Sequence, residues 1–253
     1  MVNFVGASCG AADLITVRGK SLLEKADVII YAGSLVNPEL LDYAKTDCEI
    51  YNSAYMTLEE VIAVMKKAES QHKMTVRLHT GDPSIYGAIR EQMDALDKLH
   101  IDYAVCPGVS AMFGASASLK AEYTLPDVSQ TVIITRRGGK TPVPERESIV
   151  SLASHQATMV IFLSTSMLDE LSKELIQGGY REDTPCAIVY KATWREEKIC
   201  RCTVKDLFQT AKDNNITKTA LICVGDFLGD SYSLSKLYDK NFETEFRKIS
   251  NEQ

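Results

Sequence analysis

The sequence is poor in the residues that mark several common kinds of functional site. It has four histidines in 253 residues, at positions 72, 79, 100 and 155, and they show no metal-ligand spacing. Its seven cysteines include no C-x-x-C pair. We therefore expect no protein-bound metal, and reduced thiols in a cytoplasmic protein rather than a disulfide framework.

Long apolar runs and an excess of positive charge are also missing. No window approaches the ~20 apolar residues that a membrane-spanning helix needs, and the opening Met1-Val2-Asn3-Phe4 is typical of a strand rather than of a signal peptide. Lysine and arginine total 28 against 34 aspartates and glutamates, which gives a net charge of −6. Because nucleic-acid and membrane-surface binders usually carry a basic surface, we expect neither partner.

The common nucleotide-binding motifs are absent as well. Gly139-Lys140-Thr141 resembles the end of a P-loop, but Ile134 stands at the upstream position that must be glycine. The first turn, Gly6-Ala7-Ser8-Cys9-Gly10, does not read G-x-G-x-x-G, and no acidic residue ends the second predicted strand. A phosphate cradle and an NAD site are therefore not expected, and the absence of a nucleophile elbow points away from hydrolases.

What is present is an ordinary globular composition, with 45% hydrophobic and 25% charged residues. The length exceeds the roughly 100–200 residues of a usual domain, so two α/β domains or one large one are expected. In the first half, strands and helices alternate strictly, which predicts a mainly parallel sheet. The predicted strands are 2–6, 27–32, 48–51, 74–79 and 102–106, and the predicted helices are 16–26, 38–44, 58–68, 87–99 and 109–119, with a Thr57–Glu60 capping box.

The stretch HTGDPSIYGAIREQ, residues 79–92, organises this half. It reads as the end of a strand, a tight turn, and a helical pattern that begins at Ile85 and continues through Ile89. Gly81 permits a backbone conformation closed to other residues, and Pro83 fixes its own φ. In an open α/β sheet, the carboxyl end of a strand is where ligands bind.

The second half is organised differently. The predicted strands are 129–135, 158–163, 186–192, 198–204 and 219–224, and the predicted helices are 146–154, 167–177 and 204–213. The strands at 186–192 and 198–204 are close enough in sequence to form an antiparallel hairpin, which predicts a mixed sheet. We expect an N-terminal domain over 1–122, a C-terminal domain over 123–240 and a peripheral tail over 241–253.

Several segments together resemble the tetrapyrrole methylase family. They are the turn after the first strand, the helix start at 13–16, TGDPSIYG, Pro107–Ser110 and YKATW at 190–194, and the resemblance spans roughly residues 2–230. It implies two α/β domains with S-adenosylmethionine in the cleft between them, S-adenosylhomocysteine as product, and a homodimer. The segments 34–41, 79–92 and 129–145 resemble the branch of that family that methylates C11 of precorrin-4 or cobalt-precorrin-4 in cobalamin biosynthesis.

The resemblance also implies which residues contact the cofactor, mostly through main chain and small side chains. By pattern alone, Leu163, Ala192 and Ala220 would be assigned to the core, because each is an apolar residue at the end of a predicted strand. No catalytic base is assigned. The implied contacts are Cys9, Gly10, Gly81, Asp82, Pro83, Ile85, Tyr86, Ser110, Ala111, Leu163, Ala192 and Ala220. Asp82 is expected to accept a hydrogen bond from the cofactor, or else to cap a helix over 85–99.

A precorrin is an anionic tetrapyrrole, whereas this chain is acidic overall. Local cations must then supply the attraction, and the candidates lie on a turn-rich loop and at the hairpin tip. They are Arg136, Arg137, Lys140 and Arg195. Charge-assisted hydrogen bonds to carboxylates contribute ~1.5–3 kcal/mol each when partly buried.

The first loop departs from the family pattern G-x-G-P-G-D-P-x-L. A glycine, both prolines and an aspartate are replaced at Ser8, Cys9, Ala11 and Ala12. A left-handed Ser8 would cost roughly 1–2 kcal/mol, and loss of the prolines loosens the loop before binding. Three alternatives stay open: a methylase of another corrin carbon, a family member that acts on a macromolecule such as diphthamide-pathway protein or ribosomal RNA, and a protein that binds a tetrapyrrole or adenosyl ligand without turnover.

Overall fold

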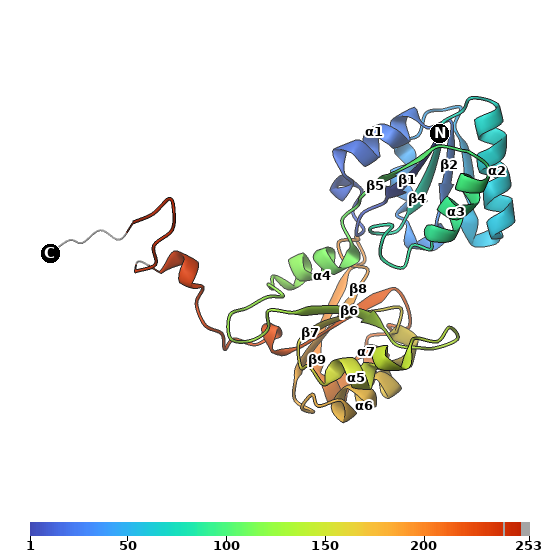
Figure 1. Ribbon diagram of the computed structural model, residues 1–253. Helices are drawn as coiled ribbons and strands as arrows, with labels where there is room; N and C mark the ends of the chain where they lie inside the picture. Colours follow the sequence, from blue (N-terminus) through green and yellow to red (C-terminus); the bar gives the residue numbers. More distant parts are fainter. Residues whose placement is uncertain (240, 249–253) are drawn as a thin grey trace. The chain divides into compact units, whose positions relative to one another are not determined.

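Figure 1 shows the computed structural model, which describes residues 1–239 and 241–248. It is an α/β protein with one parallel and one mixed sheet, so the predicted fold class is confirmed. The chain divides into two compact units. Unit 1 comprises Met1–Leu119, Val189–Ile199 and Thr219–Leu221, and unit 2 comprises the rest. Of the predicted tail 241–253, residues 249–253 lie outside the described residues.

The sheet of unit 1 has the strand order β3-β2-β4-β1-β5. Every registered pair in it is parallel, as the alternation of strands and helices predicted. Its central strands are buried on both faces, as is usual for parallel sheets covered by helices. The strands are β1 (Val2–Gly6), β2 (Val28–Tyr31), β3 (Glu49–Asn52), β4 (Thr75–His79) and β5 (Tyr103–Cys106).

Helices cover both faces of this sheet (Figure 1). One core joins Phe4 of β1 to Met65 of α2 (Leu58–Ser70) and Leu96 of α3 (Arg90–Lys98). The other core joins the opposite face to α1 (Val17–Lys25). α2 starts with the predicted capping box: Glu60 N donates to Thr57 Oγ1 over 3.3 Å, and Thr57 N donates to Glu60 Oε2 over 2.7 Å. α4 (Ala111–Leu119) follows β5.

Two predicted helices of unit 1 differ in the structure. The segment predicted at 38–44 is a 3₁₀ helix, Pro38–Tyr43, capped by Asn37. The helix predicted from residue 85 or 87 starts at Arg90, because Tyr86 and Ala88 have left-handed φ angles of 55° and 50°. An α-helix cannot pass through such residues, so 82–89 is a compact turn instead.

The second sheet has the order β6-β7-β10-β8-β9. β6 and β7 are parallel and β7 and β10 antiparallel, so the prediction of a mixed sheet is confirmed. The strands are β6 (Val132–Arg136), β7 (Thr158–Phe162), β8 (Pro185–Tyr190), β9 (Lys198–Thr203) and β10 (Ala220–Val224). The helices are α5 (Ile149–Ala153), α6 (Leu168–Gln177) and α7 (Leu207–Asp213). Among the described helices, none has the length and apolar character needed to cross a bilayer.

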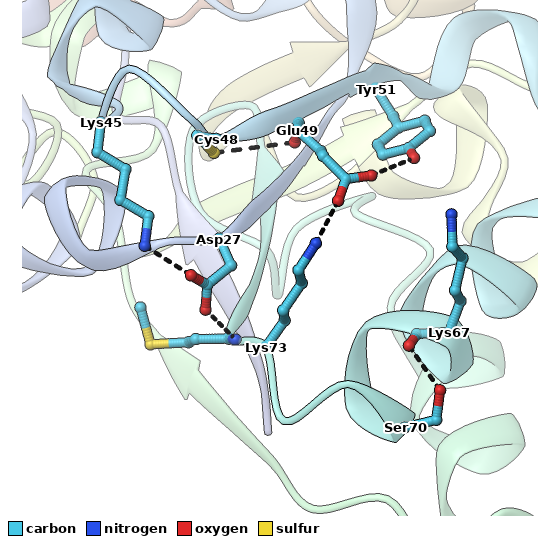
Figure 2. A network of polar contacts seen from close by, with 9 residues as sticks. Asp27, Lys45, Cys48, Glu49, Tyr51, Lys67, Ser70 and Lys73 are labelled. Carbon is cyan, nitrogen blue, oxygen red and sulfur yellow. Dashed lines mark hydrogen bonds and ion pairs between the residues drawn. The ribbon is translucent and has the colours of Figure 1, made fainter.

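Three neighbouring strands of unit 1, β2, β3 and β4, begin in a network of polar and charged groups (Figure 2). Asp27, just before β2, accepts hydrogen bonds from Lys45 Nζ at 2.5 Å and from the Met74 amide at 2.6 Å. Glu49, at the start of β3, accepts from Lys73 Nζ at 2.5 Å and from the Tyr51 hydroxyl at 2.9 Å. The network therefore ties together the chain ahead of three neighbouring strands.

Candidate functional site

At the opposite edge of the unit 1 sheet, three strand-to-helix loops meet through their backbones. Ser8 N donates to Gly81 O over 3.2 Å, and Gly81 N donates to Ser8 O over 3.0 Å. A Cβ on Gly108 would lie 2.2 Å from Gly81 O, and one on Gly6 would lie 2.5 Å from Gly108 Cα. These approaches admit no side chain, so the loops after β1, β4 and β5 are held as one backbone assembly.

Asp82 fastens this assembly with both carboxylate oxygens. Oδ1 accepts from the Ser84 amide at 2.9 Å and from the Ser84 hydroxyl, and Oδ2 accepts from the Gly108 amide at 2.9 Å. Burial raises the pKa of Asp82, but these hydrogen bonds outweigh it and hold the pKa below its ordinary value. The alternative role of Asp82, capping a helix over 85–99, is wrong because the helix starts at Arg90.

Left-handed backbone gathers near the residues that the resemblance selected. Of thirteen non-glycine residues with positive φ in the described ranges, several directly follow helix ends, where such a conformation is common. Seven others lie within two residues of predicted cofactor contacts, and strain of this kind concentrates at functional sites. The seven are Ser8, Tyr86, Ala88, Leu163, Lys191, Thr193 and Thr219. Ser8 has a φ of 67°, so this residue of the altered first loop does adopt the left-handed conformation, whose cost is roughly 1–2 kcal/mol.

A polar cluster lies buried beneath the 82–89 turn. Arg77 is 7% exposed, and its Nε donates to Gln92 Oε1 at 3.0 Å while Nη1 donates to Ile30 O at 3.1 Å. Gln92 in turn donates from Nε2 to Ala88 O over 3.0 Å. Burial lowers the pKa of Arg77 to about 10, which leaves it charged at neutral pH. The guanidinium therefore supports the left-handed turn through Gln92.

His79 and Thr80 connect this cluster to Gly81–Pro83, which we call the glycine loop. His79 is 3% exposed, and neither its Nε2 nor Thr80 Oγ1 has a hydrogen-bond partner in the described chain. Burial, with a smaller contribution from Arg77, lowers the pKa of His79 to about 3, so the imidazole is neutral at neutral pH. Buried polar atoms without partners are rare in proteins, and here two of them adjoin Gly81.

The segment after β8 reaches the first loop within unit 1. Ala192 is buried, and a Cβ on Gly10 would lie 2.4 Å from Ala192 O. Gly10 O accepts a hydrogen bond from Asn37 Nδ2 at 3.0 Å. Unit 1 therefore brings the first loop, the glycine loop, Ser110 at the start of α4 and Ala192 together. It also contains the remaining predicted contacts except Leu163, namely Cys9, Asp82, Pro83, Ile85, Tyr86, Ala111 and Ala220.

Leu163 belongs to unit 2 and follows β7. It has a φ of 52° and is 61% exposed, so its assignment to the core from pattern alone is wrong. Ser164 connects it to the predicted substrate loop, since its hydroxyl accepts from the Arg137 amide at 2.9 Å. Leu163 and the predicted substrate loop, which carries Arg136 and Arg137, thus lie at the same end of the second sheet.

The predicted substrate cations have protein partners of their own. Arg137 forms a two-point ion pair with Glu174, at 3.0 Å and 2.7 Å, and this hydrogen bonding raises its pKa. Arg136 donates from Nη1 to Thr141 O and from Nη2 to Pro142 O. Arg195 is exposed and pairs with Glu39 at 2.9 Å. Lys140 is exposed. Their role toward a substrate stays a prediction.

Sequence reasoning missed the residues that support the predicted contacts. Arg77 and His79 had a usable signal, because with Thr75 they place polar side chains on one face of an otherwise apolar strand. Gln92 was hidden in a helical pattern, and Asn37 reaches Gly10 over 27 residues of sequence, a separation that no local pattern encodes.

The assembled edge suits a ligand recognised by main-chain groups. It presents carbonyl oxygens and small side chains, and the described residues include no cluster of three His, Cys, Asp or Glu that would hold a metal. A sulfonium cofactor needs carbonyl oxygens near its positive sulfur and donors and acceptors for adenine and ribose. The residues present fit such a group.

Comparisons with known proteins agree. The sequence profile of the Tetrapyrrole (Corrin/Porphyrin) Methylases matches residues 1–207. A cobalt-precorrin-4 C(11)-methyltransferase from Methanocaldococcus jannaschii is 61% identical over 248 residues, covering 98% of this chain and 96% of that protein. The X-ray structure of a cobalt precorrin-4 methyltransferase superposes with a TM-score of 0.89 at 47% identity, covering 90% and 96%. A uroporphyrin-III C-methyl transferase from Thermus thermophilus, complexed with S-adenyl homocysteine, shares the fold at TM-score 0.73 and 21% identity, covering 90% and 92%.

Proposed function

Because this chain belongs to the tetrapyrrole methylase family, we propose that it is an S-adenosylmethionine-dependent methyltransferase that methylates C11 of cobalt-precorrin-4 in cobalamin biosynthesis. The observation that carries the proposal is 61% identity across 98% of the chain to a relative of that name. The backbone assembly at the carboxyl edge of unit 1 supports it, since it suits an adenosyl cofactor. The alternative substrate is precorrin-4 without cobalt, methylated at the same carbon.

The chemistry asks for orientation more than for activation. The sulfonium of the cofactor supplies a methyl group that is already electrophilic. A rigid main-chain surface is formed by Ser8, Gly81 and Gly108. Asp82 stabilises it by accepting a hydrogen bond from the Gly108 amide. Holding reacting atoms in line at ~3–3.5 Å can supply ~7–11 kcal/mol of the barrier. The chain's task is thus to fix the cofactor, exclude water and present the ring carbon.

Substrate carboxylates are proposed to meet Arg136, Arg137 and Lys140 of unit 2, with Arg195 of unit 1 as a further candidate. Replacing both Arg136 and Arg137 by glutamate should raise the KM for the tetrapyrrole at least ten-fold with little change in kcat. Glu174→Gln is the matched control, because it breaks the ion pair of Arg137 and keeps the cation. An unchanged KM in the double variant would show that these arginines do not bind substrate.

The first test is calorimetric titration with S-adenosylhomocysteine, with NAD as control. One-site micromolar binding of the former alone supports the cofactor assignment. Methyl transfer from labelled S-adenosylmethionine is then compared on cobalt-precorrin-4, precorrin-4 and an earlier corrin precursor. Transfer at C11 of the cobalt form supports the full proposal, preference for the metal-free form moves it to the other route, and transfer to an earlier precursor contradicts it.

The altered first loop favours one second candidate, a protein that binds the adenosyl ligand without turnover. Binding without transfer to any of the three rings would establish that candidate instead. We also expect a cytoplasmic homodimer, which sedimentation equilibrium would detect at twice the chain mass of 28.0 kDa. Copurification of ribosomal RNA would instead indicate a macromolecular substrate.

A further inference from the structure

The first loop is held by a side chain that lies far from it in the sequence. The Ala11 amide donates to Thr193 Oγ1 over 3.0 Å, and the same hydroxyl donates to Cys9 Sγ at 3.6 Å. One side chain therefore spans the two residues that flank Gly10. Thr193 follows Ala192 in the turn between β8 and β9.

Thr193 is itself held by a carboxylate. Glu197 Oε2 accepts from the Thr193 amide at 2.5 Å and from Ser118 Oγ at 2.5 Å. Ser118 lies in the last turn of α4, the helix that begins at Ala111. Hydrogen bonds to a charged acceptor are roughly twice as strong as neutral ones. Glu197 thus anchors Thr193 to the helix that carries another predicted contact.

The geometry at Thr193 is strained, which a merely solvated turn would not need. Its φ is 68°, a rare value for a β-branched residue. Close packing supports it, because a Cβ on Gly114 would lie 2.8 Å from Cys9 Cβ and 3.3 Å from Thr193 Cγ2. Strain that the surroundings enforce is a mark of a functional position.

The first loop also lacks the prolines of the family pattern, so its rigidity must come from contacts. We propose that Thr193, anchored by Glu197, is a positioning residue that fixes the Cys9–Ala11 backbone for the adenosyl cofactor. This inference rests on the proposed function and adds to it the device that holds the loop. It makes two side chains beyond the predicted contacts responsible for cofactor affinity.

The main test is the affinity for S-adenosylhomocysteine of hydroxyl-deletion variants. Thr193→Val keeps the shape and removes the hydroxyl, and it should weaken binding about ten-fold. Thr193→Ser keeps the hydroxyl and should bind within about three-fold of the wild type. Thr193→Gly removes the hydroxyl and also relieves the left-handed strain, so it should fold well and still bind weakly. Equal affinity of the wild type and Thr193→Gly would overturn the proposal.

Two further measurements separate positioning from general stability. Hydrogen exchange at the Ala11 amide should speed up in Thr193→Val and stay protected in Thr193→Ser. In enzyme assays, Thr193→Val should raise the KM for S-adenosylmethionine and leave the KM for the tetrapyrrole unchanged. Thr203→Val is the control, since it removes an exposed hydrogen bond to Asp206 in unit 2 and should change neither. An unchanged exchange rate, or equal rises in both KM values, contradicts the proposal.

A rescue sharpens the test. Ala11 has φ −60° and ψ 136°, the extended conformation that a residue before proline requires. Ala12→Pro should therefore fit and stiffen the loop, and in Thr193→Val it should recover most of the lost affinity. No recovery would show that the hydroxyl does not act by fixing the loop. If the wild type itself fails to bind S-adenosylhomocysteine, the proposed function falls, and this inference falls with it.

Discussion

The two edges of the unit 1 sheet solve different problems with the same strands. At the amino edge, charged side chains are paired, Asp27 with Lys45 and Glu49 with Lys73, and the Tyr51 hydroxyl also donates to Glu49 (Figure 2). At the carboxyl edge, glycine backbones touch, left-handed residues gather, and His79 Nε2 is buried without a hydrogen-bond partner among the described residues. The pairs at the amino edge stabilise the fold, whereas the carboxyl edge carries backbone strain of the kind that concentrates at functional sites. Variants at the amino edge should therefore change stability alone, and variants at the carboxyl edge should change binding.

The largest effect is expected at Gly108. In Gly108→Ala, the new Cβ would meet Gly81 O at 2.2 Å and Gly6 Cα at 2.7 Å, so backbone must shift. Overpacking of this kind costs ~1–3 kcal/mol, and affinity for S-adenosylhomocysteine should fall at least 100-fold in calorimetry. Gly81→Ala is the graded control: its Cβ has 3.5 Å of space, and its φ of 62° adds roughly 1–2 kcal/mol of strain. Unchanged affinity in Gly108→Ala would contradict the role of the loop assembly.

Gln92 tests the layer just beneath the carboxyl edge. Gln92→Leu leaves Arg77 Nε without its acceptor and Ala88 O without its donor, and the loss should cost ~1–3 kcal/mol in denaturant unfolding. Gln92→Glu restores an acceptor for Arg77 but no donor for Ala88. It should recover stability while the Tyr86 turn stays loose, which faster hydrogen exchange around residues 84–89 would report. Equal stability of Gln92→Leu and the wild type would contradict this account.

Asp27 tests the amino edge and its dependence on pH. The Lys45 hydrogen bond, followed by the Met74 amide, lowers the pKa of Asp27 in the folded protein. Its stabilisation is thus present above the ordinary pKa near 3.9 and is lost as pH falls through the lower folded value. Asp27→Asn should cost about 1 kcal/mol at pH 7, a modest figure because solvent screens this partly exposed pair.

The same variant also checks the contrast between the edges. Unfolding of Asp27→Asn followed from pH 7 to pH 2 should show a shallower acid loss of stability than that of the wild type. Its affinity for S-adenosylhomocysteine should be unchanged. A ten-fold weaker affinity would mean that the amino edge also shapes the ligand site, and the contrast would fail.

The smallest effect is expected at Asn37. Asn37→Asp keeps the oxygen that accepts from the Glu39 amide, so the 3₁₀ segment stays capped, but it removes the donor to Gly10 O. Affinity for S-adenosylhomocysteine should fall about three-fold, consistent with one neutral hydrogen bond of ~0.5–1.5 kcal/mol. The melting temperature should be unchanged, and Asn37→Ala, which loses the cap too, should melt lower.

Much of the fold was legible because its signals are local. The β1 boundaries were predicted at Val2–Gly6, where the structure has them, and the Thr57 capping box formed as the sequence indicated. The tight turn through Pro83 was predicted, but the helix was predicted to begin at residue 85 or 87 because Ile85 and Ile89 keep helical spacing, and spacing does not report the left-handed φ of Tyr86. The arrangement around the site is less legible. Whether Thr193 reaches Ala11 depends on packing between segments 182 residues apart.

That separation also sets an order in time. During synthesis, Thr193 follows Ala11 by 182 residues. At roughly 5–20 residues per second on the ribosome, the interval is about 10–40 s. Through that time the nascent first loop has no fastener, even if the parallel sheet has already formed. If Thr193 acts as proposed, the first loop can reach its final geometry only after residue 193 has been synthesised, whatever the state of the sheet by then.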